Sequence, residues 1–191
     1  MNLLHPTLWR TCRVLANPVR VRVLSHVSER GETHVSACAQ ACHLPMSSAT
    51  AALRALQARG LLGVRREGLF VIYFARADDS VEHATAVLAA VRQAFRRRDP
   101  AEELVRAVTA FTHVRRILIV QALVARPVAA DTLSVVCGIS RPALYRHLDK
   151  LARRGVVATD GHDVWRLCVP ASRLLQDLLT LVCAGRAPAP T

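Results

Sequence analysis

The chain has 191 residues, of which 52% are hydrophobic and 21% charged, so its composition is that of a globular protein and excludes an intrinsically disordered one. Its formal net charge is +12 at pH 7, and arginine supplies every basic side chain except Lys150. A charge of this sign and size favours a polyanionic partner, nucleic acid first and an acidic membrane surface second. Residues 1–15 lack the pattern of a signal peptide, and no apolar stretch is long enough to span a bilayer. We therefore expect a cytoplasmic protein with reduced cysteines and no membrane partner.

The first half of the chain predicts helices separated by capping residues, followed by a β-hairpin. Asn17 is a favourable N-cap, Pro18 a favourable first helical residue, and Gly31 a favourable stop. Gly60 is expected just after the end of a further helix, and Glu67-Gly68 is typical of a hairpin turn. The predicted helices are residues 3–15, 18–30, 33–42 (capped by Thr33), 46–59 and 80–98, and the predicted strands are residues 61–66 and 69–75.

The second half predicts the same succession of elements. Asp99 is a favourable N-cap, and the acidic residues that follow Pro100 suit the positive end of a helix dipole. Asp131 and Ser140 are expected to cap two consecutive helices, and Gly155 to end the second of them. The predicted helices are residues 100–111, 112–125, 131–137, 141–154 and 170–184, and the predicted strands are residues 156–159 and 164–169.

An internal repeat relates the two halves. Residues 42–62 align without a gap on residues 137–157, at an offset of 95 residues. The matched pairs are Cys42 with Cys137, Leu53 with Leu148, Leu56 with Leu151, Arg59 with Arg154, and Gly60 with Gly155. Two helices joined by a short turn and followed by a hairpin describe a winged helix-turn-helix. We therefore expect a mainly α-helical fold with small β-hairpin wings, built from two tandem winged helix-turn-helix domains at residues 1–98 (with a long linking helix) and 99–184, before a disordered tail at 185–191.

At these motifs the sequence resembles the ArsR-like family of bacterial repressors. The motifs are LANPVR (15–20), LPMSS (44–48), LRAL (53–56), RGLL (59–62) and RREG (65–68) in the first unit, and GISRP (138–142), RHL (146–148) and RRGVV (153–157) in the second. The resemblance covers most of residues 8–169. Family members usually carry one such domain per chain and dimerise through their outer helices. The resemblance implies a transcription regulator, most simply a repressor, whose fused units bind double-stranded DNA as a pseudo-dimer. Its outer helices would join the two halves or allow self-association of two chains.

The residues that such a fold directs toward DNA differ between the two units. The second recognition helix offers six candidates for phosphates or base edges: Ser140, Arg141, Tyr145, Arg146, His147 and Lys150. The first offers smaller and nearly neutral ones, Ser47, Ser48, Thr50 and Arg54, with Ala51 and Ala52 where the family pattern prefers Arg-His. The first wing carries Arg65 and Arg66, whereas the second carries Asp160 and Asp163, which would repel DNA. The second unit is therefore interpreted as the base reader and the first as a positioning contact.

Three residues at helical spacing suggest a soft metal site or a redox sensor. His34, Cys38 and Cys42 recur every four residues and would share one face of a helix. In the family pattern, however, both cysteines fall on buried apolar positions, and free cysteine is a common core residue. We therefore expect core cysteines, no metal and no cofactor. No phosphate loop, HExxH motif or carboxylate pair indicates an enzyme, so none is expected.

Three functions are compatible with these patterns. The leading hypothesis is a sequence-specific DNA-binding regulator. The first alternative is a protein–protein interaction module with weakened DNA binding, which Ala51, Ala52, Asp160 and Asp163 favour. The second alternative is a non-specific DNA-associated protein, which the net charge of +12 favours. The sequence names neither an operator nor an effector.

Overall fold

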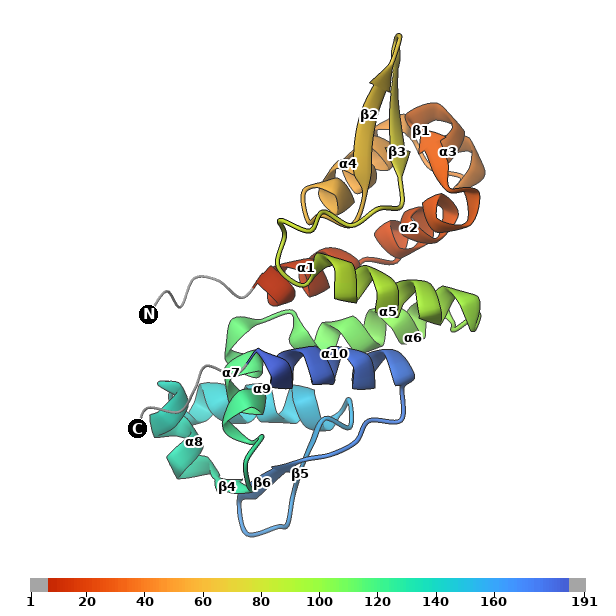
Figure 1. The fold of residues 1–191 in the computed structure, drawn as a ribbon. Helices are drawn as coiled ribbons and strands as arrows, with labels where there is room; N and C mark the ends of the chain where they lie inside the picture. Colours follow the sequence, from red (N-terminus) through yellow and green to blue (C-terminus); the bar gives the residue numbers. More distant parts are fainter. Residues whose placement is uncertain (1–6, 186–191) are drawn as a thin grey trace.

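A computed structural model describes residues 7–185 and shows a mainly helical chain with two small antiparallel sheets (Figure 1). This arrangement confirms the expected fold class at its coarse level. The start of the helix expected at 3–15 and residues 186–191 of the expected tail lie outside the described residues.

The elements of the first half follow the expected order, with one additional strand. They are α1 (Thr7–Leu15), α2 (Pro18–Arg30), β1 (Glu32–His34), α3 (Val35–Ala41), α4 (Met46–Gln57), β2 (Gly63–Glu67), β3 (Phe70–Phe74) and α5 (Ala84–Arg96). Strand β1 pairs with β3, so that the predicted hairpin becomes a three-stranded sheet of order β1-β3-β2.

The second half repeats this order, including the additional strand. Its elements are α6 (Ala101–Val108), the 3-10 turn η1 (Thr109–Phe111), α7 (Val114–Ala122), β4 (Val128–Ala129), α8 (Ala130–Cys137), α9 (Arg141–Ala152), β5 (Val157–Thr159), β6 (Val164–Leu167) and α10 (Arg173–Ala184). The sheet order, β4-β6-β5, is that of the first half. Helices α4 and α9 begin and end at positions 95 residues apart, which is the offset of the sequence repeat.

Several helix ends confirm the capping predictions. The Asn17 side chain accepts a hydrogen bond from the Arg20 N–H at 3.1 Å, and Pro18 is the first residue of α2. Gly31, Gly60 and Gly155 all adopt positive φ, at 83°, 67° and 72°. These left-handed conformations suit glycine, which has no Cβ to clash with its own backbone.

Three other capping predictions are wrong. Thr33 lies in β1, where it pairs with Tyr73, and the cap of α3 is instead the His34 ring, which accepts from the Ala37 N–H at 3.3 Å. Asp131 lies inside the first turn of α8, because the short strand β4 carries the chain directly to the cap at Ala129. Pro100, rather than Asp99, occupies the cap position of α6.

Several helices are shorter than expected, among them α5 and α10 at their starts and α4 and α9 at their ends. Helix α5 begins at Ala84 rather than at residue 80, because the Asp78 carboxylate accepts hydrogen bonds from both the N–H and the hydroxyl of Ser80 and holds a turn there. Helix α10 begins at Arg173 rather than at residue 170, after the irregular segment that follows β6.

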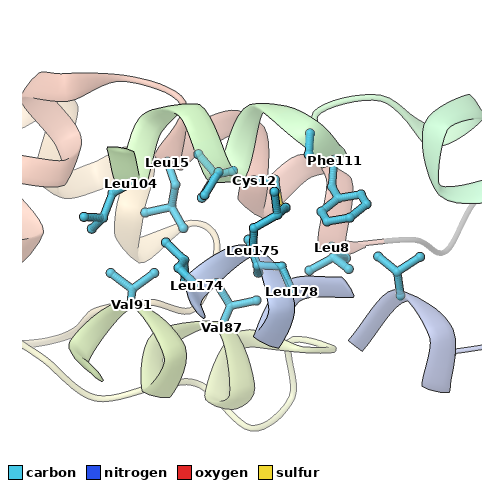
Figure 2. Packing of buried hydrophobic residues seen from close by; sticks show 14 of the residues in the cluster. Leu8, Cys12, Leu15, Val87, Val91, Leu104, Phe111, Leu174, Leu175 and Leu178 are labelled. Carbon is cyan, nitrogen blue, oxygen red and sulfur yellow. The ribbon is translucent and has the colours of Figure 1, made fainter. Parts of the chain in front are cut away.

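A middle layer of four helices, α1, α5, α6 and α10, joins the two halves. Figure 1 shows this layer between the β2–β3 hairpin at one end and the β4–β6 sheet at the other. In Figure 2 the buried side chains of the layer point toward one another; they include Leu8, Cys12, Leu15, Val87, Val91, Leu104, Leu174 and Leu178. Burying one such leucine stabilises the fold by about 1.5–3 kcal/mol. The apolar faces of the outer helices are thus covered by one another within a single chain.

Candidate nucleic-acid interface

Helix α9 has one buried face and one charged, exposed face. Its buried residues, Ala143, Leu144, Leu148 and Leu151, recur at helical spacing. They fix the helix on α7 and α8 and leave Arg141, Tyr145, Arg146 and Lys150 facing outward. The sequence repeat thus places a basic helix surface beside the β5–β6 hairpin.

Arg141 is held between two carboxylates. Its Nε lies 3.0 Å from Asp131 Oδ1, and its Nη2 lies 4.0 Å from Asp163 Oδ2. A hydrogen bond with the Tyr145 side chain, followed by the charge of Asp131, raises the pKa of the Arg141 guanidinium. Arg141 and Tyr145 are therefore both engaged within the second half of the protein.

Asp163 is fixed in place by several contacts of its own. Its carboxylate accepts hydrogen bonds from the Tyr145 hydroxyl and from Trp165 Nε1–H, the latter at 3.2 Å. Its carbonyl oxygen accepts from the Ala130 N–H at 3.0 Å, which ties the hairpin to the start of α8. Its φ of 61° is left-handed, an unusual conformation for a residue with a Cβ. One side chain therefore links the hairpin to α9, and the backbone of the same residue links the hairpin to α8.

Asp160, the other acidic residue of the second hairpin, organises the turn. Its Oδ1 accepts from the N–H groups of His162 at 2.9 Å and Val164 at 3.3 Å. The hydrogen bond from His162 is the largest cause of the lowered pKa of this carboxyl. The two aspartates that sequence reasoning treated only as sources of repulsion thus also hold the hairpin together.

His147 is directed toward α7 rather than fully into solvent. Its ring packs against that of His113, with centroids 4.7 Å apart, and it is half-buried. Burial, followed by the neighbouring His113, Arg116, Arg115 and Lys150, lowers the pKa of His147 to about 4. The ring is therefore neutral at pH 7, and His147 adds no positive charge to the surface of α9.

The remaining candidates on this helix are exposed. Ser140 is the N-cap of α9 but makes no capping hydrogen bond through its side chain, so its hydroxyl is available. The charged ends of Arg146 and Lys150 make no ion pair with any residue between 7 and 185. The uncompensated charge of α9 therefore lies at Arg146 and Lys150.

Helix α4 presents a smaller and nearly neutral surface. Ser47, Ala51 and Arg54 are exposed, Ser48 is half-buried, and Ala52 is buried. The Thr50 hydroxyl donates to the Met46 carbonyl oxygen at 2.7 Å, so the helix backbone uses its donor. Arg54 supplies the only charge among these positions.

The β2–β3 hairpin carries one compensated and one free arginine. Arg65 pairs with Glu32 at 2.8 Å and with Glu67 at 2.7 Å, and its guanidinium lies 5.5 Å from the centre of the Phe74 ring. Arg66 is exposed and makes no ion pair with the described residues. Of the two basic residues predicted on this wing, Arg66 alone has a charge that its own unit leaves uncompensated.

An exposed apolar tip on the same hairpin was missed by sequence reasoning. Leu69 is 100% exposed and Phe70 is 59% exposed, next to the positive-φ residue Gly68. The signal was present in the sequence, because two large apolar residues follow directly on the predicted Glu67-Gly68 turn. Exposed apolar groups of this kind favour a contact with another macromolecule.

The two cysteines at helical spacing are core residues, as predicted. Cys38 and Cys42 are both buried, and burial, followed by the neighbouring Cys42, raises the pKa of the Cys38 thiol to about 12. The Nδ1 atom of His34 is occupied by the cap of α3. Within residues 7–185, no group of three or more histidine, cysteine or acidic side chains is arranged to hold a metal ion.

The comparison with protein-family models and the search of curated proteins both give no match for this chain. Between residues 7 and 185, no helix combines the length and the hydropathy needed to cross a bilayer.

Proposed function

We propose that the chain is a sequence-specific DNA-binding transcription regulator, acting as a repressor, made of two winged helix-turn-helix units in tandem. The observation that carries the proposal is the repetition of one element order, with α4 and α9 at equivalent positions beside equivalent three-stranded sheets. In a winged helix-turn-helix, the second helix enters the major groove and the hairpin contacts the adjacent backbone. Helix α9, with its outward basic residues, has the surface chemistry that this role requires.

The two units act as a pseudo-dimer. The four-helix middle layer takes the place of a dimer interface, so that one chain presents two recognition helices. Successive major grooves on one side of a duplex lie roughly 34 Å apart, which sets the spacing of the two half-sites. Since α4 and α9 carry different side chains, the half-sites differ in sequence, and the operator is not a palindrome. Occupation of a promoter by the protein then excludes polymerase.

The two units have different roles in DNA binding. Helix α9 reads bases through its arginines, while α4 contacts the backbone through Ser47 and Arg54, supported by Arg66 of the wing. We therefore expect that Arg141→Ala with Arg146→Ala weakens specific binding more than Arg65→Ala with Arg66→Ala. Equal losses from the two pairs would contradict this division.

The test of the proposal is fluorescence anisotropy of the full chain on DNA from upstream of its own gene and on a scrambled duplex, at several salt concentrations. Tight binding to the upstream fragment that scrambled DNA does not displace would support a specific regulator. Binding that ignores sequence and disappears as salt rises would instead identify a non-specific DNA-associated protein.

A protein-interaction module is the second candidate, and one observation favours it. The exposed Leu69 and Phe70 offer an apolar contact, while Arg65 and Arg141 are engaged in internal ion pairs. In that case, the protein binds neither duplex even at low salt.

A further inference from the structure

The second unit surrounds one arginine with more negative charge than the arginine carries. Asp131, from the first turn of α8, and Asp163, from the β5–β6 hairpin, both face the Arg141 guanidinium. The equivalent positions of the first unit, 95 residues earlier, are Ser36, Gly68 and Met46, which carry no charge. The arrangement therefore belongs to the unit whose helix is basic and is not a general feature of the repeat.

We propose that Asp131 and Asp163 are specificity-determining residues, which prevent Arg141 from binding phosphate and reserve it for the edge of a guanine base. This inference rests on the proposed function, since it concerns how that same interface chooses its DNA.

The discrimination follows from charge. A phosphate brings a full negative charge close to two carboxylates, which repel it and have already neutralised the arginine. A guanine edge is neutral and offers two acceptors, O6 and N7. The guanidinium has five N–H donors, of which Asp131 engages the one on Nε and the Tyr145 side chain engages another, so the remaining donors are left for the base. The carboxylates therefore weaken the sequence-independent contact more than the sequence-specific one.

Of the two carboxylates, that of Asp163 is also held so that it does not turn away when DNA approaches. Trp165 Nε1–H and the Tyr145 hydroxyl both donate to the Asp163 carboxylate, and the Ala130 N–H holds the Asp163 backbone. A phosphate that reaches Arg141 must then approach a fixed negative charge. Fixed groups of this kind discriminate more strongly than mobile ones, because no rearrangement relieves the repulsion.

The experiment compares two doubly substituted proteins with the wild type. The test variant is Asp131→Asn with Asp163→Asn, in which the amide oxygen still accepts a hydrogen bond. The matched control is Asp149→Asn with Asp177→Asn, which also removes two carboxylates, each from an ion pair with an arginine four residues away, Arg153 or Arg173. Both variants therefore have the same net charge, and general electrostatic attraction to DNA rises equally in the two.

The DNA is defined by the protein itself. A random-sequence duplex library is selected with the wild-type chain, and affinities are then measured for the selected duplex and for a scrambled duplex of equal composition. For the test variant we expect affinity for the scrambled duplex to rise by about two- to fivefold per carboxylate removed, with a smaller rise for the selected duplex. The slope of log affinity against log salt should steepen by about 0.9, the value for one additional phosphate contact. The control should raise both affinities alike and leave their ratio unchanged.

Each outcome decides one point. An unchanged affinity ratio in the test variant, or an equal fall of that ratio in the control, overturns the inference and leaves the proposed function standing. Failure of the wild type to enrich any sequence overturns the proposed function, and the inference with it. Asp131→Asn alone provides a variant that leaves the contacts of the hairpin intact, so a folding defect at Asp163 does not obscure the result.

Discussion

The glycines that follow α4 and α9, Gly60 and Gly155, allow the effects of packing and of backbone conformation on stability to be measured separately with one pair of variants. Both have positive φ, but their surroundings differ. A Cβ added at Gly60 would lie 2.9 Å from the Cβ of Val81 and 3.2 Å from that of Ala84, whereas one added at Gly155 would meet no atom within 4 Å. Substitution by alanine therefore strains the backbone at both positions but forces a collision at Gly60 alone.

The magnitudes follow from these contacts. The left-handed conformation costs an alanine about 1–2 kcal/mol, and the stiffer unfolded chain offsets about 0.4–1 kcal/mol of this cost. Gly155→Ala should therefore lower the free energy of unfolding by about 1 kcal/mol. Gly60→Ala adds overpacking of about 1–3 kcal/mol, because Val81 and the start of α5 must move.

Thermal denaturation followed by circular dichroism measures the difference between the two variants. For a chain of this length, Gly155→Ala should lower Tm by about 2–4 °C, and Gly60→Ala by at least twice as much. Equal losses would refute the reasoning, because they would show that the segment around Val81 yields without cost and that conformation alone sets the effect.

Three further predictions concern the surface and the core. Arg146→Ala should cost about 1–3 kcal/mol of binding free energy on the selected duplex, whereas Arg54→Ala should weaken binding to the selected and the scrambled duplex alike. The same anisotropy assay measures both variants, and an equal loss on the two duplexes from Arg146→Ala would argue against a base contact. The pKa of His147 is lowered to about 4 in the folded protein, from about 6.5 in the unfolded chain. As the pH falls, His147 is therefore protonated in the unfolded chain before it is protonated in the folded protein, and the free energy of unfolding should decrease between about pH 6.5 and about pH 4. Urea unfolding at pH 7 and at pH 4.5 should show a smaller fall in His147→Gln than in the wild type, and an identical fall would contradict the assignment. With its thiol pKa raised to about 12, Cys38 should resist iodoacetamide at pH 8 in the folded protein and react in urea, as mass spectrometry of the labelled peptides would show.

The order of the elements could be predicted from the sequence because capping residues and repeats are local signals. Asn17, Gly31, Gly60 and Gly155 act on the backbone within a few residues of themselves. Asn17 and Gly31 bound α2 where expected, and Gly60 and Gly155 follow α4 and α9, which end two residues earlier than expected. The third strand of each sheet could not be found in this way. Strands β1 and β4 are three and two residues long, and they are defined by pairing with β3 and β6, which lie far along the chain.

The candidate site was predicted less completely than the fold, because a residue type does not reveal its partners. Arg141, Arg146 and Arg65 look alike in the sequence, but two of them face carboxylates from other elements. Arg116 is another arginine whose surroundings the sequence does not reveal. It is only 6% exposed and donates to the Thr109 carbonyl oxygen at 2.8 Å. Such contacts depend on which elements the fold brings together, and the spacing of residues along the chain does not encode them.

The covalent link between the two halves makes their assembly independent of protein concentration. A homodimer dissociates when few copies are present, and its binding to DNA then includes the cost of bringing two chains together. Here the packing of α5 on α10 is intramolecular, so dilution does not separate the halves. If the halves act together on one duplex, occupancy should follow a simple one-to-one isotherm down to the lowest concentrations at which the protein can be detected.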